Sequence, residues 1–205
     1  MFQKENMFIK YKIFFALLGF SAIVTEIAVI SERGAFNAVN FFSFFTIQTN
    51  ILVFITFILS ALSVASGKQK RWLDILRAIS TVYILVVGIG FAVLLSGLEN
   101  VALTAVPWDN TVLHYIIPIA VLIDFIIDCP KKKISFNTGL LWIAFPIIYV
   151  LYSLIRGAIV GWYPYPFLDP GLKGVGGVAL TVAGLIILGV IIIAFVTWMT
   201  KRKAR

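Results

Sequence analysis

The chain is poor in charged residues, because Asp, Glu, Lys and Arg make up only 13% of its 205 residues. A soluble domain usually carries about 25% charged residues, so the polar groups here are too few to cover a water-facing surface. A single cysteine excludes a disulfide scaffold, and the lack of low-complexity tracts excludes a disordered or collagen-like chain. Apolar residues, in contrast, make up 61% of the sequence. The composition therefore predicts an integral membrane protein.

Long apolar runs recur along the sequence, and each is close to the roughly 20 residues that a helix needs to cross a bilayer. They are continuous rather than alternating in polarity, which excludes a transmembrane β-barrel. The fourth and fifth runs are short, which indicates tilt or burial within a bundle. We expect an all-α integral membrane fold, a six-transmembrane-helix bundle forming one domain over residues 1–205. Its predicted spans are 11–30, 41–65, 72–97, 111–127, 138–155 and 175–199.

The basic residues predict how the spans are oriented. Fourteen of the 17 lie in the N-terminal segment, in the second and fourth loops with their flanks, and at the C-terminus. Only Arg33, Arg156 and Lys173 lie on the other side. Cytoplasmic loops carry an excess of Lys and Arg, so both termini are expected in the cytoplasm. For a bacterial source, the expected location is the plasma (cytoplasmic) membrane.

In this arrangement, polar groups on separate spans lie at a similar depth in the membrane. Glu26 lies near the outer end of span one, and Arg156 closes the outer end of span five, before the 162–169 segment. At 1.5 Å per residue, Thr46 lies about 7–8 Å and His114 about 4–5 Å inside the outer ends of their spans. Ionisable groups inside a bilayer are costly and are functional candidates. This coincidence predicts a functional site in the outer leaflet.

Span two carries a polar face at its outer end. Ser43, Thr46 and Asn50 share one side of a helix, and Gln48 and Thr49 lie on neighbouring faces. Hydrogen bonding between helices is the alternative role for such residues in a membrane bundle. For Ser43, Gln48 and Thr49 that alternative is favoured, whereas for Thr46 the two interpretations stay open.

The only histidine of the chain, His114, precedes Pro118 by four residues. Proline lacks the amide that would bond to the carbonyl of His114, so a kink is expected there, with room for water or ligand. The alternative is a neutral imidazole that bonds to a neighbouring helix. Asp124 lies about 15 Å deeper on the same helix, too far to orient the imidazole, and is expected to be protonated or paired. Glu26 is better placed to contact His114, although it also fits an interfacial carboxylate solvated at the membrane surface.

Other groups at the two surfaces have simpler interpretations. Asp128, beside three lysines, is expected to be a solvated end charge. No metal site is predicted, because the chain offers no recognisable set of His, Cys and carboxylate ligands. The 162–169 segment holds prolines and aromatics, and it fits equally a rigid lid over the outer mouth and an interfacial anchor.

Three motifs of the sequence resemble those of a known group of membrane proteins. They are FFTIQTN at 44–50, LHY at 113–115 with Pro118 and Asp124, and YPFLD at 165–169. The chain resembles a bacterial family of predicted six-transmembrane proteins that is distantly related to the animal androgen-induced and androgen-dependent TFPI-regulating membrane proteins. The animal members are threonine hydrolases that cleave fatty acid esters of hydroxy fatty acids. The resemblance implies that Thr46 is the nucleophile and His114 its partner.

On that resemblance we expect an intramembrane lipid ester hydrolase that acts on an amphipathic acyl ester in the outer leaflet. His114 would act as general base and acid for Thr46. Asn50 and Gln48, with Tyr115 as a further candidate, are the expected oxyanion donors, and Glu26 is the expected third member that orients the imidazole. Supporting or substrate-binding roles are expected for Arg156, Tyr165 and Asp169. Membrane lipids are the expected partners, with no cofactor and no nucleic acid. The alternative is a transporter or lipid-binding membrane protein without catalysis.

Overall fold

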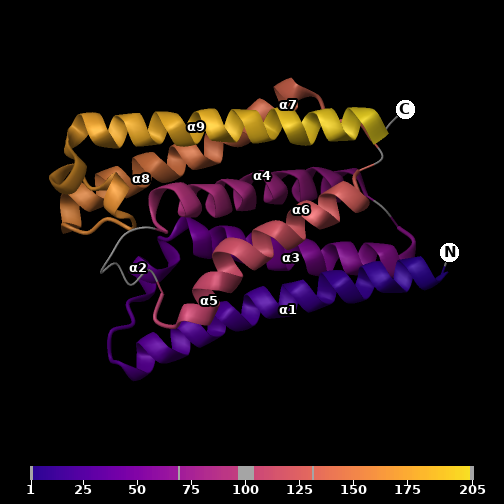
Figure 1. Cartoon of the computed structure of the whole chain (residues 1–205), viewed down its shortest axis with the longest axis horizontal. Coiled ribbons are helices and arrows are strands. Elements are labelled where there is room, and N and C mark those ends of the chain that lie inside the picture. The colour runs from indigo at the N-terminus through magenta and orange to yellow at the C-terminus, as the bar shows by residue number, and fades with distance from the viewer. Residues whose placement is uncertain (1, 69, 97–103, 131, 204–205) are drawn as a thin grey trace.

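The chain folds as a bundle of helices (Figure 1) in a computed structural model that describes residues 2–68, 70–96, 104–130 and 132–203. Six helical stretches within these residues are long and apolar enough to cross a membrane, so the chain is a multi-pass integral membrane protein. The elements in chain order are α1 (Phe2–Glu32), α2 (Ala38–Phe42), α3 (Phe45–Ser66), α4 (Arg71–Leu94), α5 (Pro107–Thr111), η1 (Val112–Ile116), α6 (Ile117–Ile127), α7 (Phe136–Leu140), η2 (Leu141–Ile143), α8 (Ala144–Val160), η3 (Pro166–Leu168) and α9 (Pro170–Lys203).

The boundaries of the helices differ from the sequence-based spans where polar residues interrupt the apolar pattern. Residues 38–42 form the separate short helix α2, whose N-cap Asn37 accepts a hydrogen bond from the amide of Asn40. The extended backbone of Phe44 then starts α3 at Phe45 rather than at 41. The fourth and fifth spans are not short, because they run over Pro107–Ile127 and Phe136–Val160. Residue 97, the predicted end of span three, lies outside the described residues. So do Lys131 and Arg205, two of the fourteen basic residues on the predicted cytoplasmic side.

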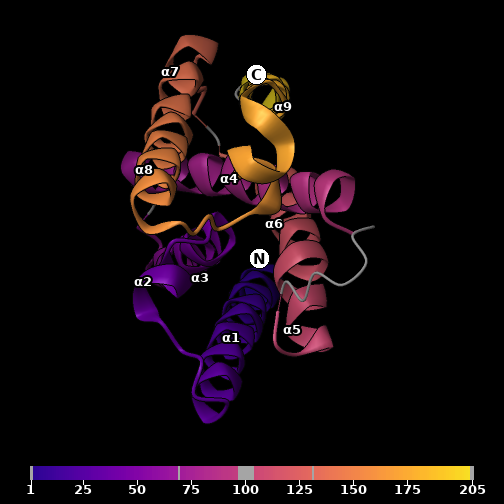
Figure 2. The same ribbon diagram turned by 90° about the vertical axis from the view of Figure 1, so that its left-hand side faces the viewer.

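Helix α4 lies at the centre of the molecule (Figures 1 and 2). It packs against α3 and α6 on one side and against α9 on the other, while α1 packs along α3. Helices α8 and α9 therefore lie on one side of α4, and α1 and α6 lie on the other, as Figure 2 shows. Helix α1 begins and α9 ends at the same end of the bundle (Figure 1), and we refer to it as the terminal end.

A cluster of buried charges joins three of these helices toward the terminal end. Lys12 of α1 is fully buried and contacts Asp124 of α6, and it lies 3.2 Å from the carboxylate of Asp128. Arg77 of α4 lies 3.0 Å from Asp124 and 3.1 Å from Asp128. Asp124 is thus paired, one of the two states expected for it. Asp128, however, is half-buried and paired rather than solvated. Lys12 and Arg77, two of the fourteen basic residues that the charge pattern assigns to the cytoplasmic side, lie within the bundle.

Breaking this cluster should destabilise the protein, because a charge that loses its partner inside the bundle costs about 3–5 kcal/mol. We expect Lys12→Met to lower the melting temperature in detergent markedly. The matched control is Lys10→Met on the same helix, where the side chain is exposed, and it should melt as the wild type does. Equal melting temperatures for the two variants would contradict a stabilising role of the cluster.

Candidate functional site

Thr46 lies in the first turn of α3, at the end of the bundle opposite the termini, and its side chain is buried. The first amides of a helix have no partner within the helix, and the N-cap Phe44 supplies no side-chain acceptor. One of these amides has an acceptor outside the helix: the amide of Thr46 donates to the hydroxyl oxygen of Tyr165 at 3.1 Å. Thr46 therefore stands at the positive end of the α3 dipole, where developing negative charge is stabilised.

The hydroxyl of Thr46 contacts both His114 and Tyr165. Its Oγ1 lies 3.3 Å from Nε2 of His114 and 3.1 Å from the hydroxyl of Tyr165. The other ring nitrogen of His114, Nδ1, lies 3.1 Å from the carbonyl oxygen of Asn110. A carbonyl oxygen can only accept a hydrogen bond, so Nδ1 carries the proton of the neutral imidazole. Nε2 is then an acceptor directed at the Thr46 hydroxyl, which is the arrangement that a general base needs.

The backbone around His114 departs from an α-helix. Residues Val112–Ile116 form a π-helical turn, with the amide of Ile117 bonded to the carbonyl of Val112, five residues before it. In such a turn an amide bonds to residue i−5 instead of i−4. The carbonyl of Asn110, which accepts from the imidazole Nδ1, lies four residues before His114, just ahead of this turn. The backbone distortion expected before Pro118 is thus present.

The imidazole is also held by packing. The ring of Phe91 on α4 stacks on the ring of His114, with 4.0 Å between centroids and 23° between planes. Helix α4 approaches this closely because Gly88 faces Pro118. A Cβ at Gly88 would lie 2.9 Å from Cβ of Pro118 and 3.2 Å from the carbonyl oxygen of His114.

Tyr165 comes from the segment between α8 and α9. Its ring stacks on Phe167 with 4.9 Å between centroids and meets Phe44 edge-on at 5.5 Å. Burial raises the pKa of the Tyr165 hydroxyl, although hydrogen bonds from Thr46 and Phe45 oppose this shift. The phenol therefore stays protonated and keeps an O–H to donate. This segment, expected to be a lid or an anchor, contributes a side chain to the site itself.

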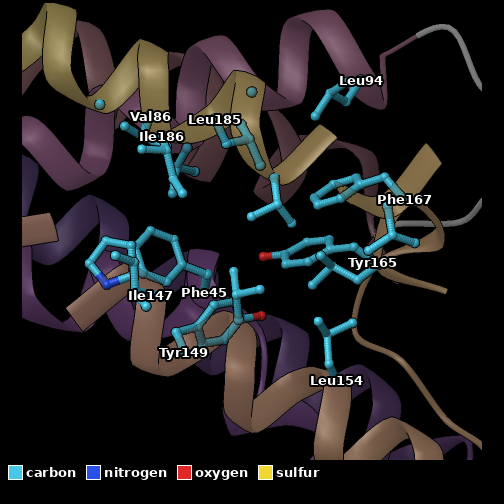
Figure 3. Close-up of a pocket in the computed structure, with 18 of the residues that line it drawn as sticks. Phe45, Val86, Leu94, Ile147, Tyr149, Leu154, Tyr165, Phe167, Leu185 and Ile186 are labelled. Carbon is cyan, nitrogen blue, oxygen red and sulfur yellow. The ribbon is translucent and has the colours of Figure 1, made fainter. Parts of the chain in front are cut away.

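The site forms part of the wall of a large apolar chamber. The chamber has a volume of about 600 Å³ and lies between α3 and α4 on one side and α8 and α9 on the other. Aliphatic and aromatic side chains surround it, among them those labelled in Figure 3. Three of its lining residues, Ile147, Leu151 and Val175, are 42%, 54% and 78% exposed on the flank of the bundle. The chamber thus lies against the apolar flank formed by α8 and α9.

The expected oxyanion donors have other partners. The amide nitrogen of Gln48 donates to the carbonyl of Phe42 at 2.8 Å, at the end of α2. That of Asn50 donates to the carbonyls of Thr46, at 2.9 Å, and of Leu113, at 3.4 Å, and so ties α3 to the π-helical turn. Tyr115 is 38% exposed and packs edge-on against Phe91. None of these three side chains directs a donor at the Thr46 hydroxyl, whereas Tyr165 does.

The expected charged residues hold the surroundings of the site rather than its reactive groups. Both carboxylate oxygens of Glu26 accept from the amide of Ala105 at 2.8 Å, so Asn110 and not Glu26 orients the imidazole.

Arg156 and Asp169 likewise fix the segments on either side of Tyr165. Arg156 donates to Oδ1 of Asn40 at 2.6 Å and lies over the ring of Trp162. The Asp169 side chain accepts from the amide of Gly171 at 2.7 Å at the start of α9.

Filling the space at Gly88 should disturb the turn that carries His114. We expect Gly88→Ala to lower the stability by about 1–3 kcal/mol, as overpacking of a close contact does. Gly184→Ala in α9 is the matched control, since a Cβ at Gly184 has no described heavy atom within 4 Å. Thermal unfolding in detergent measures both. A Gly88→Ala variant as stable as the control would contradict the close contact between α4 and the π-helical turn.

Comparison of the chain with protein-family models, with curated proteins and with solved structures finds no match. The geometry at Thr46, His114 and Tyr165 therefore carries the functional argument.

Proposed function

We propose that the chain is an intramembrane ester hydrolase with Thr46 as nucleophile and His114 as general base. The observation that carries the proposal is a series of hydrogen bonds that all run in one direction. Tyr165 donates to Thr46, Thr46 donates to His114, and His114 donates to the carbonyl of Asn110. Each of the two hydroxyls, of Tyr165 and of Thr46, accepts one hydrogen bond and donates another. These hydrogen bonds lie at the wall of an apolar chamber, which has room for a long acyl group.

The acylation step follows from these positions. As Thr46 Oγ1 attacks the ester carbonyl carbon, Nε2 of His114 takes the hydroxyl proton. The negative charge that develops on the carbonyl oxygen is stabilised by the O–H of Tyr165 and by the positive end of α3. The tetrahedral intermediate then collapses, the bond to the leaving alcohol breaks, and His114 returns the proton to that alcohol. An acyl ester of Thr46 remains.

The substrate class is inferred from the chamber. Its volume lies in the range of about 300–1,000 Å³ of typical ligand pockets, and its aliphatic lining suits a fatty acyl chain. The resemblance to the hydrolases of fatty acid esters of hydroxy fatty acids supports an ester of that kind or a similar amphipathic ester. On the charge asymmetry of the loops we place the site in the outer leaflet, in the plasma membrane of a bacterial source.

A lipid-binding protein without catalysis is the second candidate, and the apolar chamber itself favours it. Such a protein needs the chamber but not the hydroxyl of Thr46 or the acceptor nitrogen of His114. The two candidates therefore differ in what substitution of these side chains does to lipid binding and to ester turnover.

The proposal predicts that Thr46→Ala and His114→Ala each lower the rate of ester hydrolysis by about 10²-fold or more. Tyr165→Phe should lower it by about 10²–10³-fold through loss of one oxyanion donor. The measurement is hydrolysis by detergent-purified protein of a panel that includes a branched fatty acid ester of a hydroxy fatty acid, a monoacylglycerol and a lysophospholipid. Folding is checked by gel filtration.

Thr49→Ala is the matched control for the nucleophile. Thr49 is a buried threonine one turn along α3 whose hydroxyl has no hydrogen-bond partner among the described residues, so the variant should keep wild-type turnover. If the wild type binds these lipids but cleaves none of them, the lipid-binding candidate stands instead. If Thr46→Ala keeps full turnover, another group is the nucleophile.

A further inference from the structure

A second, smaller pocket borders the same groups. Its volume is about 60 Å³, and Thr46, His114 and Tyr165 line both this pocket and the large chamber. The three side chains thus lie where the two spaces meet.

The two spaces differ in chemical character. Apart from the shared groups, the chamber is lined mostly by aliphatic and aromatic side chains, whereas the small pocket has Glu26 and Thr104 in its wall. A buried water needs roughly 10–15 Å³ of accessible volume and two to four polar partners. The small pocket offers more than this volume and five polar side chains, but it has no room for an acyl chain.

Glu26 is the charged group of this wall, and its position is fixed. Both of its oxygens accept from the amide of Ala105, and a carboxylate oxygen has lone pairs left for further donors. Asp109, which is fully buried, neighbours Glu26, and neither of its carboxylate oxygens has a hydrogen-bond partner within the described part of the chain. Glu26 is therefore held by the amide of Ala105 alone among these two neighbours.

We propose that the small pocket is the water site of the hydrolase and that Glu26 is the residue that positions the water. This inference rests on the proposed function. A water held between Glu26 and His114 attacks the carbonyl carbon of acyl-Thr46 from the small pocket, and Nε2 of His114 takes one of its protons. The bond from the acyl carbon to Thr46 Oγ1 then breaks, His114 returns the proton to Oγ1, and the fatty acid leaves with the oxygen of the water.

This arrangement separates the two reactants by polarity. The acyl chain occupies the apolar chamber, from which water is excluded, while water reaches the same carbonyl carbon from the polar side. Obstruction of the small pocket should therefore block deacylation and spare acylation. That separation makes the proposal testable apart from the overall activity.

The test uses a p-nitrophenyl ester of a fatty acid, because p-nitrophenol is released on acylation and acyl-Thr46 is detected by intact-protein mass spectrometry. Ile30→Phe places a larger side chain in the small pocket, whose wall includes Ile30. Val24→Phe is the matched control on α1, since Val24 is 46% exposed. Glu26→Gln removes the charge but keeps one oxygen for the Ala105 amide.

For Ile30→Phe and Glu26→Gln we expect an initial release of p-nitrophenol within threefold of the wild-type rate. Steady-state turnover should fall by tenfold or more and acyl-Thr46 should accumulate, while Val24→Phe behaves as the wild type does. If the two variants turn over slowly without acyl-Thr46, or turn over normally, the water site is wrong and the hydrolase proposal stands. If the wild type neither releases p-nitrophenol nor becomes acylated at Thr46, the proposed function fails and the water site with it.

Discussion

The hydrogen bond from His114 to the carbonyl of Asn110 sets the chemistry of the site, because a carbonyl leaves the imidazole no choice of tautomer. His114 itself lies in the π-helical turn just before Pro118. In a bilayer every backbone group must find a partner within the protein. The side chain of His114 is a partner for one such carbonyl, and this hydrogen bond orients the proposed base.

The two polar regions of the molecule are connected through α4 and the helix that continues from η1 into α6. Near the terminal end, Arg77 of α4 pairs with Asp124 of α6. Toward the opposite end, Gly88 of α4 faces Pro118 and the carbonyl of His114. The ion pairs fix how far these helices slide along each other, and the glycine contact fixes how closely they approach. The position of the imidazole against Thr46 depends on both.

The apolar runs predicted the six spans, since hydropathy is summed over many residues and single errors cancel. The sequence also brought Thr46 and His114 to one level, and Pro118 signalled the distortion beside the base. The sequence could not predict which residues of different helices contact each other, because no local pattern indicates which helices are neighbours. Gln48 and Asn50 were expected at the oxyanion because they are close in sequence, yet both bond to backbone carbonyls. Asn110 acts through a backbone carbonyl, which every residue has, and Phe91 resembles the other apolar residues of its helix.

The origin of Tyr165 in the segment between α8 and α9 has a consequence for how the protein is made. The spans that carry Thr46 and His114 are synthesised first, and together they hold the proposed nucleophile and base. Tyr165, which meets both the amide and the hydroxyl of Thr46, is added only after the fifth helix has emerged from the ribosome. A nascent chain that has inserted four helices therefore lacks the proposed oxyanion donor and one wall of the chamber. On the proposed function, acylation of Thr46 therefore waits until the last hairpin docks.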